Sequence, residues 1–352
     1  MAAANKTMEK IVETQPKKAL SGQRFKSVDA LRGIAAFVVV LCHQVHAFNN
    51  EYGYKPAPYF TFWFGYFGVE LFFMISGFVI YYTLQQSNSL KEFWIKRFIR
   101  LFPTYWLCLV ITFLAVSLFP LSPLRNSSIK EALYGLLMFN GLFGVKSVDP
   151  SYWSLLIELL FYLMMSVVLY FKLFQHIYTI LWSWLVLVLV YNFIYKLPGL
   201  GAFLNLRYGP LFIIGICFYK MRMEGDRQWY VWLLIASCFV TCIFVLEDMH
   251  GIAWAMVVIM FLFVMAVFVT PNLFENKLLL FLGKISYPLY LIHQNVGFVM
   301  LSQLQKRGFT HPVVVLIPIS VCVLIAWLIT TFYETRVSSF FRNWLLKPRA
   351  NK

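Results

Sequence analysis

The stretch LRGIAAFVVVLCHQVHAF, residues 31–48, decides the fold class. It is an apolar run that approaches the roughly 20 residues needed to cross a bilayer. It nevertheless carries Arg32, His43 and His46, three ionisable residues that are costly in hydrocarbon and are functional candidates for that reason. Because similar apolar runs follow along the chain, we expect a membrane protein with several transmembrane helices.

The composition supports this class. Hydrophobic residues make up 61% of the 352 residues and charged residues only 13%, whereas an ordinary soluble domain is about half apolar and about a quarter charged. The mean hydropathy is +0.71. We predict an all-α polytopic bundle of about ten transmembrane helices. They are expected over residues 31–48, 60–84, 101–120, 153–171, 178–196, 203–221, 230–248, 251–270, 285–303 and 312–333.

The net charge of +15 indicates an orientation in the membrane rather than a nucleic-acid partner. Of the 30 Lys and Arg residues, 22 fall in segments that would be cytoplasmic if the N-terminus is cytoplasmic, and 8 fall outside. This bias fits the positive-inside rule and predicts that both termini are cytoplasmic. The basic residues are spread over separate loops and tails, which disfavours binding of nucleic acid.

We expect three regions: a disordered cytoplasmic tail over 1–27, a transmembrane domain over 28–335 and a basic cytoplasmic tail over 336–352. No cleavable signal peptide is apparent, so the first span would be an uncleaved anchor. The six cysteines lie within predicted spans without zinc-site spacing, so neither disulfides nor a metal site is expected. The outer loop 121–152 contains an apolar piece that is either re-entrant or flat on the membrane.

Arg32 and His43 are predicted to share one face of the first span. They are eleven residues apart, which at about 100° per residue is only about 20° from three full turns. Gly33, Ala35 and Ala36 would let other helices pack closely there. The alternative interpretation is an arginine that only sets topology and a histidine at the membrane interface.

Two carboxylates lie inside predicted spans. Glu70, within GYFGVELFFMISGFVI, should find a partner, with Arg32 or a histidine of the first span as the candidate. Glu158, within DPSYWSLLIELLFY, lies near the expected depth of His43, where a carboxylate can fix an imidazole tautomer. Ser154 lies one helical turn before Glu158, and Trp153 suits the outer interface. Structural polar pairs between helices are the alternative for both carboxylates.

The segment KEFWIKRFIRLFPTYW, residues 91–106, is predicted to be a cytoplasmic loop leading into the third span, with Pro103 in the first helical turn. Arg97 and Arg100 lie three residues apart with Lys96 adjacent, and paired guanidinium groups suit phosphate. The alternative is a basic cluster that only sets topology.

A polar stripe is predicted late in the chain, in FLGKISYPLYLIHQNV, residues 281–296. Tyr287, Tyr290 and His293 are three residues apart and should lie on one face of the ninth span at mid-membrane depth. They would either line a cavity or form hydrogen bonds between helices, and the second is favoured for the tyrosines. Glu334 is expected to pair with Arg336 or a loop cation.

Taken in order, these segments resemble the membrane-bound acyltransferase 3 family. The resemblance is carried by five stretches between residues 27 and 293: SVDALRGIAAFVVVLCH, GYFGVELFFMISGFVI, KRFIRLFPTYW, YWSLLIELLFY and LGKISYPLYLIH. They are similar to the family's Arg-x10-His, FF-xx-SG, Arg-x-x-Arg, WSL-x-x-E and SY-x-LYL-x-H motifs.

The resemblance implies a multi-pass protein of a bacterial cytoplasmic membrane that transfers an acyl group, commonly acetyl, from cytoplasmic acyl-CoA to hydroxyls. Acceptors in the family are mostly carbohydrates, often cell-envelope polysaccharides or their lipid-linked precursors. It implies that His43 is the essential histidine, acting as general base or acyl relay. It also implies that Arg32 is the partner arginine of this histidine, that Glu158 is the motif glutamate and that Arg97 and Arg100 bind acyl-CoA. We expect catalytic roles for Arg32 and Glu158 and add Lys96 to the acyl-CoA site. The expected substrate contacts are Ser154, Trp153, Glu70 and His293.

Some residues depart from the family pattern. Glu70 stands where many members have Asp, and Leu159 and Leu160 replace polar residues that often follow the WSL-x-x-E glutamate. The chain resembles the stand-alone subgroup without a hydrolase-like domain, so a separate extracytoplasmic partner is one expectation. A transporter of a lipid-linked sugar or small solute is the runner-up, and a structural membrane subunit is the third reading.

Overall fold

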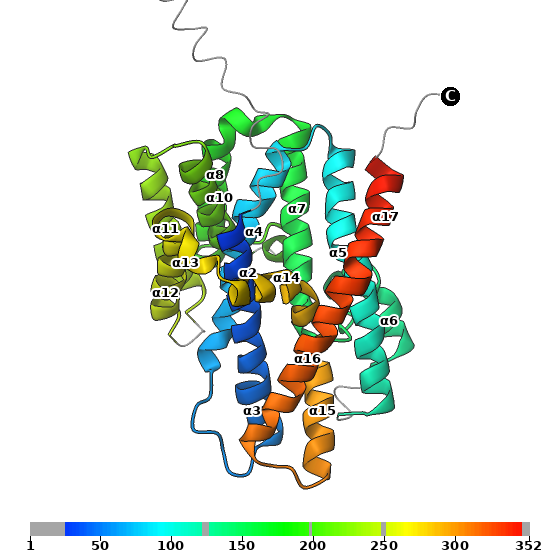
Figure 1. Ribbon diagram of the computed structural model, residues 1–352. Helices are drawn as coiled ribbons and strands as arrows, with labels where there is room; N and C mark the ends of the chain where they lie inside the picture. The colour runs from blue at the N-terminus through cyan, green and yellow to red at the C-terminus, as the bar shows by residue number, and fades with distance from the viewer. Residues whose placement is uncertain (1–24, 122–126, 197–198, 248–250, 347–352) are drawn as a thin grey trace, which may run out of the picture.

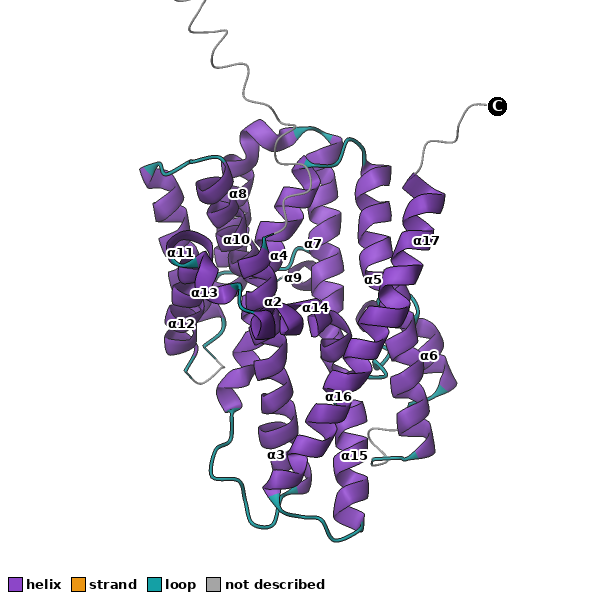
Figure 2. Ribbon diagram, viewed as in Figure 1, coloured by secondary structure: helices purple, strands orange, loops and turns teal. Residues whose placement is uncertain are grey.

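The computed structural model describes residues 25–121, 127–196, 199–247 and 251–346, and in this part of the chain every regular element is helical (Figures 1 and 2). Most of the predicted N-terminal tail, residues 1–24, and the last six residues of the predicted C-terminal tail lie outside the described residues. Residues 335–346 of that tail region form a helix.

The helices follow one another through short connections. The longer ones are α2 (Lys26–Leu41), α4 (Gly68–Gln85), α5 (Leu90–Leu118), α7 (Trp153–Tyr170), α8 (Ile177–Phe193), α10 (Gly209–Met223), α11 (Trp229–Val245), α12 (Ile252–Val264), α14 (Lys277–Ile292), α15 (Asn295–Lys306), α16 (Leu316–Leu328) and α17 (Thr335–Leu346). The shorter ones are α3 (Phe48–Tyr52), α6 (Ile129–Gly135), α9 (Leu200–Phe203) and α13 (Pro271–Phe274). Wider, π-helical turns join α2 to α3 and α16 to α17.

The protein is an all-α, multi-pass membrane protein. Within the described residues, 7 continuous helical segments are long and apolar enough to cross a bilayer. Among the remaining predicted spans, α11 has 17 residues and α10 has 15. The predicted start of the sixth span at residue 203 is wrong, because α9 ends there and α10 begins at Gly209 with Pro210 in its first turn.

The predicted ninth span is not one helix. α14 ends at Ile292, α15 begins at Asn295, and Figure 1 shows α14 running across the middle of the bundle. The buried carboxylate of Asp149 accepts hydrogen bonds from the backbone N–H groups of Ser151, at 2.9 Å, and Asn295, at 3.0 Å. Because helix N-termini favour negative charge, this one carboxylate stabilises the starts of two helical segments and favours the break.

The third span also differs from its prediction. Ser89 accepts the backbone N–H of Glu92 as an N-cap, so α5 begins at Leu90 and Arg97 and Arg100 lie on a helix rather than in a loop. Pro103 consequently lies inside α5 and not in its first turn. The two arginines are therefore held by a rigid element.

The apolar piece of the outer loop packs against the middle of α5. The Tyr105 hydroxyl donates to the Gly135 carbonyl at 2.8 Å, and the Trp106 indole donates to the Leu136 carbonyl at 2.9 Å. Because both donors lie in the central part of α5, the loop reaches the level of the middle of that helix, while most of α6 is exposed at the edge of the bundle. This contact supports the re-entrant alternative.

Small residues let α2 cross the other helices closely, as predicted. A Cβ atom on Gly33 would overlap the backbone of Leu282 and Gly283, and one on Gly283 would overlap the backbone of Asp29. Backbone-to-backbone approach of this kind is typical of membrane helices. It brings the side chains of α2 and α14 into one cluster at the centre of the protein.

Candidate active site

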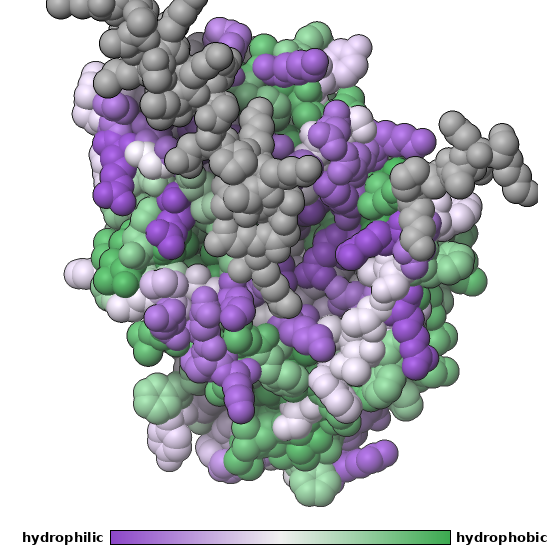
Figure 3. All heavy atoms as spheres, turned by 45° about the horizontal axis from the view of Figure 1, so that its top comes forward, coloured by the Kyte–Doolittle hydropathy of each residue, from purple (hydrophilic) through white to green (hydrophobic). Residues whose placement is uncertain are grey.

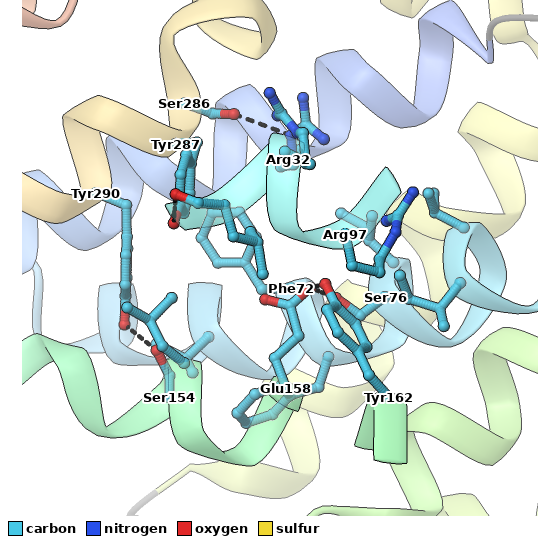
Figure 4. A pocket seen from close by; sticks show the side chains of 18 residues that line it. Arg32, Phe72, Ser76, Arg97, Ser154, Glu158, Tyr162, Ser286, Tyr287 and Tyr290 are labelled. Atoms are coloured by element: carbon cyan, nitrogen blue, oxygen red, sulfur yellow. Dashed lines mark hydrogen bonds between the residues drawn. The ribbon is translucent and has the colours of Figure 1, made fainter. Parts of the chain in front are cut away.

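A cavity of about 100 Å³ lies at the centre of the bundle, between α2, α4, α5, α7 and α14. Figure 4 shows its polar lining: Arg32 and Ser286 on one side, the Tyr290–Ser154 pair at one end, and Glu158 with Ser76 and Tyr162 toward the other. Sequence motifs far apart in the chain therefore meet at one place, which is the arrangement expected of a functional site.

Three arginines stand between this cavity and a larger groove of about 790 Å³. Arg32, Arg97 and Arg100 line both spaces, so the groove and the cavity meet at these guanidinium groups. We call this meeting point the arginine neck. It combines the Arg-x10-His and Arg-x-x-Arg stretches that the sequence singled out.

Each arginine of the neck is held by a different contact. Arg32 Nε donates to Ser286 Oγ at 2.9 Å, and its Nη2 lies 3.4 Å from Asp29 Oδ1. Arg100 forms an ion pair with Glu334. Glu334 was expected to pair with Arg336 or a loop cation, and its partner instead lies on α5.

Arg97 keeps an unused donor. It donates through Nη2 to Thr83 Oγ1 at 3.2 Å, while its Nε is buried without a hydrogen-bond partner among the described residues. A buried, unsatisfied guanidinium N–H is costly, so this donor is a candidate for binding an anionic ligand.

Glu158 does not contact His43, contrary to the prediction. Its carboxylate accepts hydrogen bonds from Ser76 and from Tyr162, which lies one helical turn further along α7. Glu158 and His43 line different cavities, and His43 has His293 beside it instead. Glu158 instead shares the central cavity with the arginine neck.

Tyr290 forms a wall between two cavities. It lines the central cavity and also a second cavity of about 170 Å³ that contains His43, and Val69 likewise lines both. The Tyr290 hydroxyl lies 2.6 Å from Ser154 Oγ and donates to the Ser151 carbonyl at 2.9 Å. These contacts give Tyr290 the interhelical hydrogen-bonding role favoured from the sequence and put Ser154 at the boundary.

His43 pairs with His293. The Nδ1 atom of His43 lies 3.2 Å from Nε2 of His293 and 3.0 Å from the Val39 carbonyl. His293 is fully buried, and its own Nδ1 lies 2.6 Å from the Tyr290 carbonyl. The sequence predicted a polar stripe ending at His293 but did not predict its histidine partner.

Glu70 lines the same cavity as His43, beside Trp153 and Tyr208. Its predicted partner was Arg32 or a histidine of the first span: Arg32 lines the other cavity, whereas His43 lines the same cavity as Glu70. Glu70 is only 2% exposed, and its Oε2 has no hydrogen-bond partner among the described residues. The ring centres of Trp153 and Tyr208 lie 5.4 Å apart, so this cavity offers an aromatic surface next to the unpaired Oε2 of Glu70.

The spacing of residues along single helices is a signal for two further residues of the site. Tyr162 follows Glu158 by four residues and Ser286 precedes Tyr290 by four, the spacing at which helical side chains meet. Tyr208 had no such signal, because it comes from a distant segment. Among the described residues, no group of His, Cys, Asp and Glu could hold a metal ion, and all six cysteines are buried and free.

Comparison with known proteins identifies one domain over almost the whole chain. A family model described as an acyltransferase domain matches residues 25–332. This range contains the arginine neck, both cavities and the histidine pair. No solved structure matches the chain.

Curated relatives are similar over part of their length. The peptidoglycan O-acetyltransferase OatA of Listeria monocytogenes serovar 1/2a is 32% identical over 154 residues, 39% of this chain and 23% of OatA. A Staphylococcus aureus (strain COL) protein named "Putative O-acetyltransferase SACOL0978" is 26% identical over 361 residues, 88% of this chain and 56% of that protein. The acyltransferase MdmB of Streptomyces mycarofaciens is 29% identical over 151 residues, 40% of this chain and 38% of MdmB. The chain thus spans about a quarter to about half of these relatives.

Proposed function

The chain belongs to the acyltransferase family whose domain model covers it, and from this premise we propose that it transfers an acyl group from cytoplasmic acyl-CoA to a carbohydrate hydroxyl. Acetyl is the proposed acyl group, in line with the O-acetyltransferase names of the relatives. The proposed acceptor is a cell-envelope polysaccharide or its lipid-linked precursor, and the proposed location is a bacterial cytoplasmic membrane.

One observation carries the proposal: a cationic groove, the arginine neck and a buried polar cavity follow one another and end at the wall before His43. Acyl-CoA has the matching order, with phosphates at one end and a thioester at the end of a long arm. The phosphates would bind Arg97 and Arg100, with Lys96 in the same groove, because guanidinium forks suit phosphate oxygens. The arm would enter the central cavity past Arg32.

His43 would provide the reactive nitrogen. The Tyr290 carbonyl can only accept, so Nδ1 of His293 carries its hydrogen, and a neutral His293 has its lone pair at Nε2. Nδ1 of His43 faces that lone pair and the Val39 carbonyl, and therefore carries a hydrogen as well. With both rings neutral, the basic lone pair of His43 is at Nε2. His293 would thus act as a positioning residue that selects this tautomer.

The reaction then balances in a simple way. Nε2 of His43 accepts the proton of the acceptor hydroxyl, whose oxygen attacks the thioester carbonyl carbon. The carbon–sulfur bond breaks, and the CoA thiolate takes the proton from His43. In the second route, Nε2 of His43 attacks the thioester carbon, the carbon–sulfur bond breaks and the CoA thiolate leaves, so that His43 holds the acyl group as an acyl-imidazolium. The acceptor oxygen then attacks the acyl carbon, the carbon–nitrogen bond breaks, and the hydroxyl proton passes to the CoA thiolate. Both routes need the same tautomer and release the same products.

The second cavity would bind the acceptor. Trp153 and Tyr208 offer rings on which a sugar ring can pack, and the unsatisfied Oε2 of Glu70 can accept a sugar hydroxyl. Tyr290 separates this cavity from the donor side, so the acyl group must pass its side chain. Ser154, which holds the Tyr290 hydroxyl, would set how readily that wall opens.

The test uses the purified chain in lipid nanodiscs supplied with acetyl-CoA. CoA release that rises when soluble oligosaccharide is added would support the proposal. The runner-up, transport of a lipid-linked sugar or small solute, predicts binding or movement of solute without consumption of acyl-CoA. Absence of acetyl-CoA turnover and of acetyl-CoA binding would contradict the proposed function.

A further inference from the structure

One wall of the cationic groove has no role in the chemistry above. It is formed by α17, whose residues at every third or fourth position line the groove: Thr335, Ser338, Ser339, Arg342 and Leu346. α17 is held against α5 by the edge-to-face contact of Phe341 with Phe98, at 6.0 Å between ring centres. Figure 1 shows α17 running beside the part of α5 that begins the helix. The basic C-terminal segment is therefore a wall of the groove in this structure.

The groove carries a large positive charge. Its lining contains six basic side chains, Arg32, Lys96, Arg97, Arg100, Lys284 and Arg342, and two carboxylates, Asp29 and Glu334, which gives a formal charge of +4. Figure 3 shows hydrophilic side chains gathered at this end of the molecule, near the C-terminal helix. An acyl-CoA carries about four negative charges, two on the pyrophosphate and up to about two on the ribose phosphate monoester. The charges of groove and donor are thus complementary.

Lys284 and Arg342 differ from the other four basic residues. Both are exposed, whereas the other four are half-buried, and neither lines the central cavity, as is also true of Lys96. Among the described residues, neither forms an ion pair, whereas Lys96 pairs with Glu92 at 2.7 Å and Arg100 with Glu334. The groove therefore has two outer cations with no protein carboxylate assigned to them.

The order of the chemical groups along acyl-CoA indicates which group these two cations would bind. A thioester inside the central cavity puts the pyrophosphate near the arginine neck and the adenosine 3′-phosphate further out. We infer that Arg342 and Lys284, with the hydroxyls of Ser338 and Ser339, form the subsite for this 3′-phosphate, so that α17 is part of the donor site. This inference rests on the proposed function. It extends the donor site beyond the Arg-x-x-Arg stretch to Arg342 on α17 and Lys284 on α14, two residues to which the sequence assigned no ligand.

A phosphate of an anionic lipid headgroup has similar chemistry, so the test must separate the two sources. We would compare acetyl-CoA with 3′-dephospho-acetyl-CoA as donors, using the full chain in nanodiscs of zwitterionic lipid and in nanodiscs containing anionic lipid. A charged hydrogen bond is worth about 1.5–3 kcal/mol, or roughly a 10- to 150-fold change in KM. Wild type should prefer acetyl-CoA by about that factor in KM, with similar kcat for both donors.

The decisive variant is Arg342→Ala. It should raise KM for acetyl-CoA roughly tenfold or more while leaving KM for 3′-dephospho-acetyl-CoA unchanged. Lys284→Ala should act in the same direction, and Arg342→Lys should restore part of the preference. Arg336→Ala is the matched control, because Arg336 lies on α17 but does not line the groove, and it should keep the full preference. Each variant is compared with wild type for monodispersity, so that misfolding is recognised.

Two results would overturn the subsite: no change of KM in Arg342→Ala, or an equal change for both donors. An effect that is equal for both donors and present only with anionic lipid would assign these cations to a lipid headgroup instead. If wild type does not turn over acetyl-CoA, the proposed function fails. The subsite is then decided separately by equilibrium binding of CoA and 3′-dephospho-CoA to wild type and Arg342→Ala.

Discussion

The Nδ1 atom of His43 lies 3.2 Å from Nε2 of His293, across 250 residues of sequence. The contact exists because α14 stops at Ile292 and His293 lies at the break before α15. The same break is stabilised by Asp149, which also accepts the N–H of Ser151 just before α7. The geometry of the histidine pair is thus coupled to the packing of three helical segments.

The role of His293 can be tested by separating tautomer control from packing. His293→Phe keeps the volume but removes the acceptor, and we expect kcat to fall roughly 10- to 100-fold with little change of KM for acetyl-CoA. His293→Gln can again present an acceptor to His43 and should recover part of kcat. Nitrogen-15 NMR of histidine-labelled protein in lipid should show His43 protonated at Nδ1.

Two results would contradict this role. One is an equal loss of kcat in His293→Phe and His293→Gln, with the nitrogen resonances of His43 unchanged. The other is a wild-type His43 protonated at Nε2.

Arg97 should contribute mainly to donor binding. Its buried Nε has no partner among the described residues, so a phosphate or carbonyl oxygen of the donor can satisfy it. We expect Arg97→Ala to raise KM for acetyl-CoA roughly 10- to 100-fold. Lys91→Ala is the control, because Lys91 lies on α5 but outside the groove. Steady-state kinetics at several salt concentrations check this, and an unchanged KM in Arg97→Ala would remove Arg97 from the donor site.

Glu70 should affect the acceptor and not the donor. With chitotetraose as the probe acceptor, Glu70→Gln should raise the sugar concentration for half-maximal CoA release roughly tenfold, because a charged acceptor is replaced by a neutral one. KM for acetyl-CoA should stay the same, since Glu70 does not line the central cavity. A change in KM for acetyl-CoA alone would place Glu70 on the donor side instead.

The crossing of α2 and α14 can be tested through stability. Gly283→Ala should lower the thermal midpoint measurably, because the new Cβ meets the backbone of Asp29 and overpacking costs about 1–3 kcal/mol. Gly135→Ala is the comparison, since its Cβ would first meet the movable end of the Leu109 side chain, at 3.3 Å. Equal midpoints for the two variants would show that the close crossing is not required.

Local patterns allowed the sequence to predict much of this structure. Long apolar runs predicted the helices, glycines predicted the close crossing at Gly33, and the spacing of Arg97 and Arg100 predicted a shared face. These features depend on a residue and its neighbours within a few turns of helix. The motifs that resemble the acyltransferase 3 family predicted that their polar residues belong to one site.

The errors concern contacts between distant segments. Glu158 was expected beside His43, but His293 lies there instead. His293 lies at the break between α14 and α15. The start of α15 is bound by Asp149, which is 146 residues away from Asn295 in the sequence. The segment after residue 335 was expected to be a basic cytoplasmic tail, and the sequence did not predict that α17 packs on α5 and lines the groove with Arg342. Periodicity within one helix carries no information about either contact.

The central claim, that His43 takes part in acyl transfer, can be tested directly. Wild type, His43→Ala and His46→Ala would be purified in nanodiscs and incubated with acetyl-CoA labelled in the acetyl group, while CoA release and label on the protein are followed. His46 is the control, since it lies on the same helical segment and hydrogen-bonds Asn50 at 3.0 Å. We expect turnover in wild type and His46→Ala and a loss of about 100-fold or more in His43→Ala. Full turnover by normally folded His43→Ala would contradict it.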